Sequence, residues 1–152
     1  MSLPAVRAVL VTTDFSELGD RAVPWACAIL APGGVVHLVH VIEPPHAPNP
    51  LYAHYTPGRT PTPEERAAQR RALEDRLRAL FPDDAAARDV TAEVDVAEDR
   101  DVAHGICRIA AEREVDVICM SSHGRSGLSK AVLGSVAERV LERCARPLLV
   151  VR

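Results

Sequence analysis

Five short apolar segments rich in β-branched residues alternate along the chain with segments of helical periodicity. Most of them are almost continuously aliphatic, which is typical of strands buried on both faces of a parallel sheet. The third alternates apolar with polar residues, and this pattern predicts a half-exposed strand at a sheet edge. The predicted strands are residues 6–12, 35–42, 90–96, 115–120 and 146–151.

Between these strands, four segments carry apolar residues every three or four positions and are predicted to be helices. The first opens at residues 14–17 and ends at the Pro-Gly-Gly of residues 32–34. The second has a full start signal, with Thr62 at the N-cap, Pro63 in the first turn and the acidic Glu65 three residues after the cap. The third and fourth have apolar stripes at Val102, Ile106, Ile109 and Ala110, and at Val136, Val140 and Cys144.

The strict alternation of strand and helix predicts an α/β fold with helices on both faces of a parallel sheet. Right-handed crossovers favour a doubly wound, Rossmann-like or flavodoxin-like sheet with five strands in the order 3-2-1-4-5. Because the chain has no internal repeat and no second set of elements, we expect residues 1–152 to form a single domain. Seven of the 12 prolines lie between residues 44 and 63, so we expect residues 44–62 to form an extended, mobile loop.

Composition and charge narrow the classes of function. Apolar residues make up 47% of the chain and charged residues 26%, as in an ordinary globular domain. The net charge of -3 and the pI near 6.1 disfavour a nucleic-acid binder, which normally presents a basic face. No apolar run approaches the roughly 18 residues that a membrane span needs, and no leader-like pattern opens the chain. We therefore expect a cytoplasmic protein with neither a nucleic-acid nor a membrane partner.

The cysteines are predicted to be buried free thiols. All of them lie in apolar patterns, and no two are spaced as Cys-x-x-Cys. Free thiols of this kind behave as small apolar core residues, so we expect neither disulfides nor zinc ligands. The residues concerned are Cys27, Cys107, Cys119 and Cys144.

The carboxyl ends of three predicted strands indicate one ligand site. In a doubly wound sheet, ligands bind beyond these ends, at the point where the strand order reverses between the first and fourth strands. We therefore expect the residues at these ends to border one crevice. They are Thr12, Thr13 and Asp14 for the first strand, Val41, Ile42 and Glu43 for the second, and Met120, Ser121, Ser122, His123 and Gly124 for the fourth.

The segment after the fourth strand has the composition of a phosphate site. Residues 121–135 contain three glycines and five serines, which let a backbone approach a phosphate closely and donate hydrogen bonds to it. Gly134 and Ser135 lead into the last helix, whose N-terminal dipole favours anions. These features favour a phosphate or nucleotide ligand, although neither standard glycine-rich fingerprint is present. The segment also carries the cationic or protonatable His123, Arg125 and Lys130.

Each of these features also has a purely structural interpretation. Asp14 can be a helix N-cap with Glu17 completing a capping box, and Ser135 with Glu138 has the spacing of a second box. The glycines can be turn residues, and the cations of the loop can be solvated surface charges. Residue types alone leave both interpretations open.

Three blocks of the chain carry a resemblance that spans essentially its whole length. They are residues 9–17, residues 38–42 and, most specifically, residues 122–151 with Ser-His-Gly-Arg-Ser-Gly and Leu-Gly-Ser-Val-Ala-Glu-Arg-Val. These blocks resemble the universal stress protein family. Its ATP-binding branch carries Gly-x2-Gly-x9-Gly-Ser/Thr. Here Gly124, Gly134 and Ser135 match that motif, and Ser121 occupies the position of the first glycine.

The resemblance implies ATP as ligand, with Mg²⁺ or Mn²⁺ carried on the phosphates and no metal ligands from the chain. Asp14 would hold the ribose, and the backbone of Val41 would read the adenine. Ser121 and Gly124 would line the ribose and triphosphate, and the start of the last helix would donate to the phosphates. The nucleotide-binding residues expected in this way are Thr12, Thr13, Asp14, Val41, Met120, Ser121, His123, Gly124, Arg125, Gly134, Ser135 and Val136.

The same resemblance implies a cytoplasmic stress-response protein that acts as a nucleotide-dependent regulator. It also implies a homodimer formed through the last strand, residues 148–151, which would pair two exposed sheet edges. The chain has no recognisable nucleophile–base pair and no lysine-bearing P-loop, so we expect at most a slow ATPase. The alternative is a dimeric stress-related interaction protein that does not bind nucleotide, and Ser121 is the main support for it.

Overall fold

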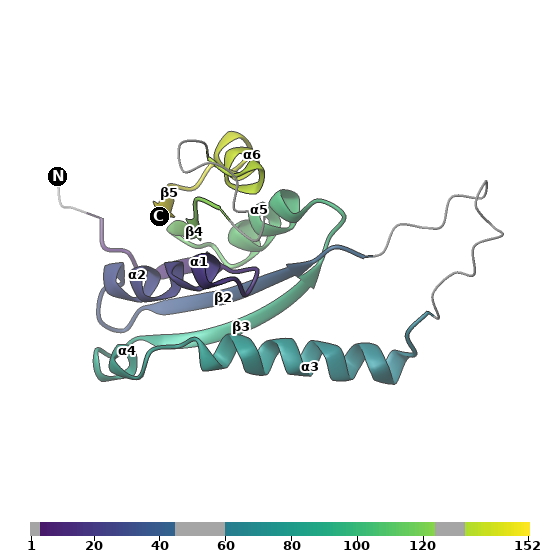
Figure 1. Cartoon of the computed structure of the whole chain (residues 1–152). Coiled ribbons are helices and arrows are strands. Elements are labelled where there is room, and N and C mark those ends of the chain that lie inside the picture. Colours follow the sequence, from purple (N-terminus) through teal and green to yellow (C-terminus); the bar gives the residue numbers. More distant parts are fainter. Residues whose placement is uncertain (1–3, 45–59, 124–132) are drawn as a thin grey trace.

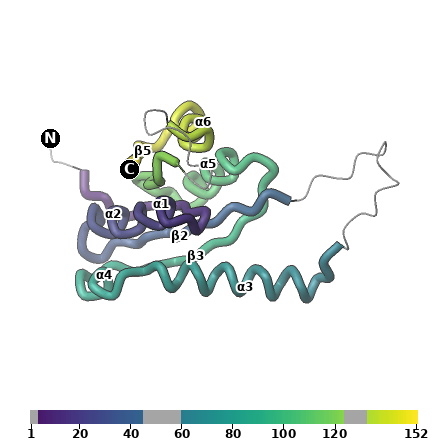
Figure 2. The backbone as a smooth tube through the Cα atoms, in the orientation of Figure 1, coloured from purple at the N-terminus to yellow at the C-terminus, as the bar shows by residue number. Residues whose placement is uncertain are grey.

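The computed structural model describes residues 4–44, 60–123 and 133–152 (Figures 1 and 2). Within these residues the strands form one parallel sheet of five strands in the order β3-β2-β1-β4-β5. The predicted fold class and strand order are thus confirmed, with the order reversing between β1 and β4. The strands are β1 (Ala8–Thr12), β2 (Val35–Ile42), β3 (Thr91–Glu98), β4 (Val117–Ser121) and β5 (Leu148–Val151).

Helices cover both faces of the sheet because successive strand residues point to opposite sides. Along β1, Val9 and Val11 pack with the helices of one face, whereas Leu10 between them packs with the helices of the other. The first face carries α1 (Glu17–Asp20), α2 (Ala22–Ile29), α3 (Pro63–Ala79) and α4 (Asp83–Ala87), and the second carries α5 (Val102–Glu112) and α6 (Ser135–Arg143) (Figure 1).

The helices differ from the prediction at two places. The first predicted helix is divided into α1 and α2, which Arg21 separates. Pro24 explains the division, because it lacks the N–H that would bond to Asp20 in a continuous helix. The short α4 follows Pro82, where the sequence predicted only a helix stop. The start of α3 is as predicted, with a capping box between Thr62 and its third helical residue.

The proline-rich segment lies largely outside the described residues. The predicted loop covers residues 44–62, and residues 45–59 of it are not described. Its mobility and the assignment of residues 1–152 to one domain therefore stay predictions.

The prediction of free thiols is wrong for two of the four cysteines. Cys107 in α5 and Cys144 after α6 form a disulfide, with Cα atoms 5.4 Å apart. Their helices pack side by side on one face of the sheet, which brings together residues 37 positions apart in the sequence. Cys27 and Cys119 are buried free thiols, as predicted.

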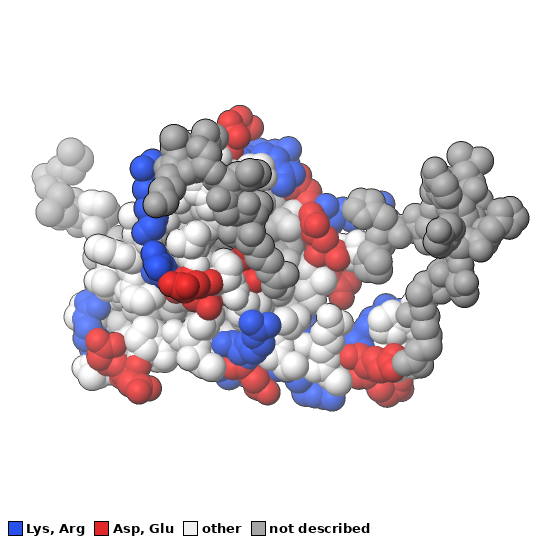
Figure 3. All heavy atoms as spheres, viewed as in Figure 1, with Lys and Arg blue, Asp and Glu red and all other residues white. Residues whose placement is uncertain are grey.

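Charged side chains of both signs are interspersed over the described part of the face in Figure 3. The area over α2 is largely uncharged there, in keeping with its sequence Ala-Val-Pro-Trp-Ala-Cys-Ala-Ile, in which Trp25 is exposed. None of the helices in the described ranges combines the length and the apolarity needed to cross a bilayer. The expected absence of a nucleic-acid partner stays a prediction.

A buried histidine in β2 predicts a loss of stability in mild acid. His37 is 7% exposed, and its Nδ1 lies 3.3 Å from a carboxylate oxygen of Glu93. Burial lowers the pKa of His37 below the ordinary 6.5. Arg113 lowers it further, whereas Glu93 and Asp95 oppose the shift. The unfolded chain therefore binds a proton at His37 more readily than the folded protein does. The stability that the neutral, buried His37 contributes is present above about pH 6.5 and is lost as the pH falls toward the folded-state pKa.

We expect the free energy of unfolding to decrease between about pH 7.5 and about pH 5.5. A His37→Gln variant should show a flatter dependence over this range, because the titrating group is gone. Urea unfolding at a series of pH values measures both slopes. Equal slopes for the variant and the parent would show that His37 does not carry the effect.

Candidate functional site

A cavity of about 360 Å³ opens at the carboxyl ends of β1, β2 and β4, where the strand order reverses. One wall is apolar and comes from Val102 and Ile106 of α5 together with Met120 of β4. Polar lining comes from Thr13 and Asp14, which follow β1. The first turn of α6 also lines the cavity. This is the position at which doubly wound sheets bind ligands.

Most of the predicted site residues border this one cavity. The sequence did not indicate His40, Val102, Ile106 and Ala137, which also line it, because no pattern tells which way a core side chain points. His123 is described but does not line the cavity, and Gly124 and Arg125 lie outside the described residues. The predicted residues that line it are Thr12, Thr13, Asp14, Val41, Met120, Ser121, Gly134, Ser135 and Val136.

Asp14 is held by the turn that follows β1. Its Oδ1 accepts from the N–H of Ser16 at 3.0 Å and from the Ser16 hydroxyl at 2.5 Å. The N-cap of α1 is Ser16, which accepts from Gly19 N–H, so the interpretation of Asp14 as a cap paired with Glu17 is wrong. A Cβ on Gly19 would lie only 2.6 Å from Asp14 Oδ1. The carboxylate is therefore fixed at the border of the cavity by its own turn.

A series of side-chain contacts links α3 to the turn after β1 that borders the cavity. His40 Nδ1 donates to the carbonyl of Thr13 at 2.8 Å, and the His40 ring lies 4.7 Å from that of Phe15. Phe15 adopts the left-handed φ of 61°, which is unusual for a residue with a bulky side chain. The Arg76 guanidinium of α3 lies 4.0 Å above the Phe15 ring, in a cation–π contact. These contacts brace the turn that carries Asp14.

Backbone groups of β2 and β4 face the space beyond the end of β1. In β2, the carbonyl of Val39 points toward β1, where it accepts from Thr13 N–H, and the carbonyl of Ile42 points toward β3. Because residues two apart on a parallel strand point the same way, the N–H and C=O of Val41 also point toward β1, past its last paired residue. In β4, Ser122 N–H bonds to β5, so the backbone of Ser121 points to the β1 side.

The start of α6 approaches the end of β4 very closely. Gly134 is the N-cap, its N–H donates to the carbonyl of Ser122 at 2.7 Å, and no side chain caps the helix. Ser135 is thus the first helical residue, and the predicted capping box with Glu138 is wrong. A Cβ on Gly134 would lie 2.7 Å from the Ser122 carbonyl oxygen, so close approach rather than an unusual φ requires this glycine.

The N–H groups of the first turn of α6 have no partner inside the helix, since helical bonds begin only four residues on. They belong to Ser135, Val136 and Ala137, all of which line the cavity. The Ser121 hydroxyl donates to the carbonyl of His123 at 2.7 Å and so turns back onto its own loop. Within the described residues, no group of three or more His, Cys, Asp or Glu side chains is placed to hold a metal ion.

Comparison with known proteins gives the family. The sequence model of the universal stress protein family matches residues 5–152. The chain belongs to the universal stress protein family. The match covers nearly the whole chain, so the resemblance seen in the sequence blocks is confirmed for this universal stress protein.

Individual relatives of this universal stress protein agree with that assignment. The universal stress protein MJ0577 of Methanocaldococcus jannaschii is 45% identical over 47 residues, a stretch that spans 31% of this chain and only 29% of that protein. The solved structure of MJ0577 has a TM-score of 0.71 at 24% identity and covers 97% of this chain and 96% of its own. These values show a shared fold.

Two solved relatives were determined with adenine nucleotides. A universal stress protein in complex with cAMP has a TM-score of 0.56 at 24% identity, covering 98% of both chains. The universal stress protein of Archaeoglobus fulgidus in complex with dAMP has a TM-score of 0.59 at 15% identity, covering 99% of this chain and 100% of its own. Family members thus bind adenine nucleotides on this fold.

Proposed function

We propose that this protein is a stress-response regulator that binds ATP in the cavity where the strand order reverses. The observation that carries the proposal is the cavity itself, which joins an apolar wall, two outward-facing strand backbones and an uncapped helix start. The cAMP and dAMP complexes of two relatives support an adenine nucleotide as the class of ligand.

The apolar side of the cavity suits the base. Val102, Ile106 and Met120 offer a surface on which a purine ring can be removed from water. The backbone N–H and C=O of Val41 face the same space and can pair with the donor and acceptor edge of an adenine. Asp14, held in place by Ser16, can accept hydrogen bonds from the ribose hydroxyls.

The other side of the cavity suits the phosphates. The N–H groups of Ser135, Val136 and Ala137 and the helix dipole favour an anion at the start of α6. The Gly134 N–H, expected as a further donor, is already bonded to Ser122. Mg²⁺ or Mn²⁺ would be carried on the phosphates, since a bound metal there needs oxygen ligands that the nucleotide supplies. Gly124 and Arg125 stay predicted nucleotide-binding residues.

We propose that the protein acts in regulation rather than in catalysis. The sequence has no recognisable nucleophile–base pair and no lysine-bearing P-loop, and we propose at most slow hydrolysis. We also propose a cytoplasmic location and a homodimer through β5. This strand lies at a sheet edge and keeps Leu148, Leu149 and Val150 only partly buried. Pairing two such edges would bury them.

Titration with ATP and Mg²⁺ by calorimetry tests the proposal, with the mass of the protein in solution measured on the same sample. We expect saturable binding and a dimeric mass. Asp14→Ala should weaken binding by about ten- to a hundredfold, because a hydrogen bond to a charged group is worth about 1.5–3 kcal/mol. Asp75→Ala is the control, since Asp75 is 75% exposed on α3 and pairs with Arg78 of its own helix. Equal ATP affinity of the Asp14 variant and the parent would show that Asp14 does not bind the ribose.

The alternative is an interaction protein that does not bind nucleotide. It is favoured by two contacts in which the loop satisfies its own polar groups, from Ser121 to His123 and from Gly134 to Ser122. Absence of any heat of binding up to millimolar ATP, together with a dimeric mass, would establish this alternative and exclude the regulator.

A further inference from the structure

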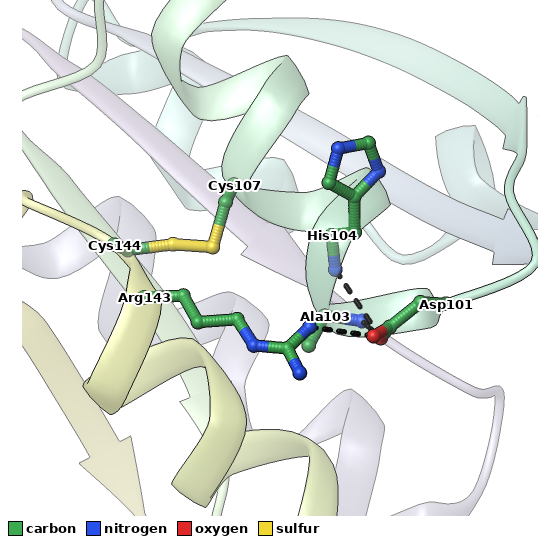
Figure 4. Close-up of a disulfide and its surroundings, with 6 residues drawn as sticks. All are labelled: Asp101, Ala103, His104, Cys107, Arg143 and Cys144. Atoms are coloured by element: carbon green, nitrogen blue, oxygen red, sulfur yellow. Dashed lines mark hydrogen bonds and ion pairs between the residues drawn. A yellow bond between two sulfur atoms is a disulfide. The ribbon is translucent and has the colours of Figure 1, made fainter.

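The disulfide joins the two helices that form the walls of the proposed nucleotide site. Figure 4 shows Cys107 on α5 bonded to Cys144 at the end of α6. Val102 and Ile106 of α5 line the cavity, and Ile106 directly precedes Cys107. The first turn of α6 lines it as well. A bond between these helices therefore constrains two walls of one site.

The other contacts between the helices are weaker. Asp101, the N-cap of α5, accepts from Arg143 at 2.6 Å (Figure 4). It also accepts from Arg139 at 3.2 Å. The hydrogen bond from Arg143 is the main cause that lowers the pKa of Asp101. Both arginines are more than a third exposed, and exposed ion pairs typically contribute only about 0–1 kcal/mol. When the disulfide is open, α6 is held on α5 mainly by apolar contacts.

Solvent exposure distinguishes the two disulfide-bonded cysteines from the two free ones. Cys107 and Cys144 are both partly exposed, whereas Cys27 and Cys119 are buried. Burial raises the pKa of Cys119 to about 12 and also raises the pKa of Cys27, so these thiols stay protonated and poorly reactive. Thiol–disulfide exchange in the described part of the chain is therefore confined to Cys107 and Cys144.

We infer that Cys107 and Cys144 form a reversible oxidation site that sets the ATP affinity of the cavity, an inference that rests on the proposed function. The oxidised form holds α5 and α6 in the geometry that lines the cavity, and such pre-organisation strengthens binding. In the reducing compartment that the sequence predicts, the pair is open, and an oxidative stress closes it.

The oxidant is a small-molecule disulfide such as oxidised glutathione. One cysteine thiolate attacks it, forms a mixed disulfide and releases one glutathione thiolate. The second cysteine thiolate attacks the mixed disulfide, closes the Cys107–Cys144 bond and releases the second glutathione. The protein loses two electrons and two thiol protons, and the oxidised glutathione becomes two thiols.

ATP affinity measured in both redox forms of the full chain tests the inference. The forms are set with glutathione buffers and verified by counting free thiols. We expect the reduced protein to bind ATP with Mg²⁺ about five- to tenfold more weakly than the oxidised protein. The double variant Cys107→Ser/Cys144→Ser should bind like the reduced protein in both buffers. The Cys27→Ala variant, which keeps the pair, should retain the response.

Linkage supplies a second readout. If the disulfide strengthens ATP binding by a given factor, saturating ATP must raise the equilibrium constant for disulfide formation by the same factor. Equal ATP affinity in the two redox forms would overturn the inference and leave the proposed function intact. Absence of ATP binding in both forms would overturn the proposed function. In that case hydrogen exchange at α6 amides such as those of Glu138 and Cys144 tests whether the disulfide constrains α6. Equal exchange in the two redox forms would overturn the inference as well.

Discussion

Reduction of the Cys107–Cys144 disulfide should lower the free energy of unfolding by about 4 kcal/mol. The bond closes a loop of 37 residues, and opening it returns the corresponding chain entropy to the unfolded state. For a chain of this size such a change lowers the melting temperature by roughly 8–15 °C. Thermal or urea unfolding with and without a phosphine reductant measures it.

The matched control is the double variant Cys107→Ser/Cys144→Ser. Its stability should equal that of the reduced parent and should not respond to the reductant. The Cys27 and Cys119 thiols remain in both proteins, so they contribute equally. A parent protein that melts at one temperature in both buffers, after thiol counting has verified the two redox forms, would contradict the prediction.

The strands were predictable because they depend on short, local patterns, and their order followed from the right-handed crossovers that favour a doubly wound sheet. β2 has the predicted bounds, since all eight of its residues are apolar or histidine between clear breaks. The position of the cavity followed as well, because a reversal between β1 and β4 places their carboxyl ends side by side. The contribution of the predicted residues to ligand binding stays a prediction.

Features that depend on how separate elements pack were not predictable. The disulfide requires α5 and α6 to lie side by side with two facing cysteines, and no local pattern records this. Ile106 was assigned to a core stripe, but its position over the strand ends depends on the rotation of α5. The capping interpretations of Asp14 and Ser135 were wrong for a related reason. The N-caps of α1 and α6 are Ser16 and Gly134, and which residue caps a helix depends on where the chain turns into it.

Replacing Gly134 by alanine should weaken ATP binding at the proposed site by at least about tenfold. The new Cβ would lie 2.7 Å from the Ser122 carbonyl oxygen, and this neighbour is backbone that a rotamer change cannot move aside. Either the start of α6 or the end of β4 must shift, and the bond from Gly134 N–H to Ser122 is disturbed. Displacing donors by a fraction of an ångström is enough to lose much of their interaction with a bound anion.

Gly34 offers a matched control at the opposite end of the sheet. A Cβ there would lie 2.8 Å from the carbonyl oxygen of Ala31, and Gly34 N–H bonds to that same carbonyl, as Gly134 N–H bonds to Ser122. Both alanine variants should therefore lose about 1–3 kcal/mol of stability through overpacking. Only Gly134→Ala should lose ATP affinity, because only that glycine lies at the cavity. Equal losses of affinity in the two variants would mean that binding follows overall stability, and the start of α6 would no longer be the phosphate site.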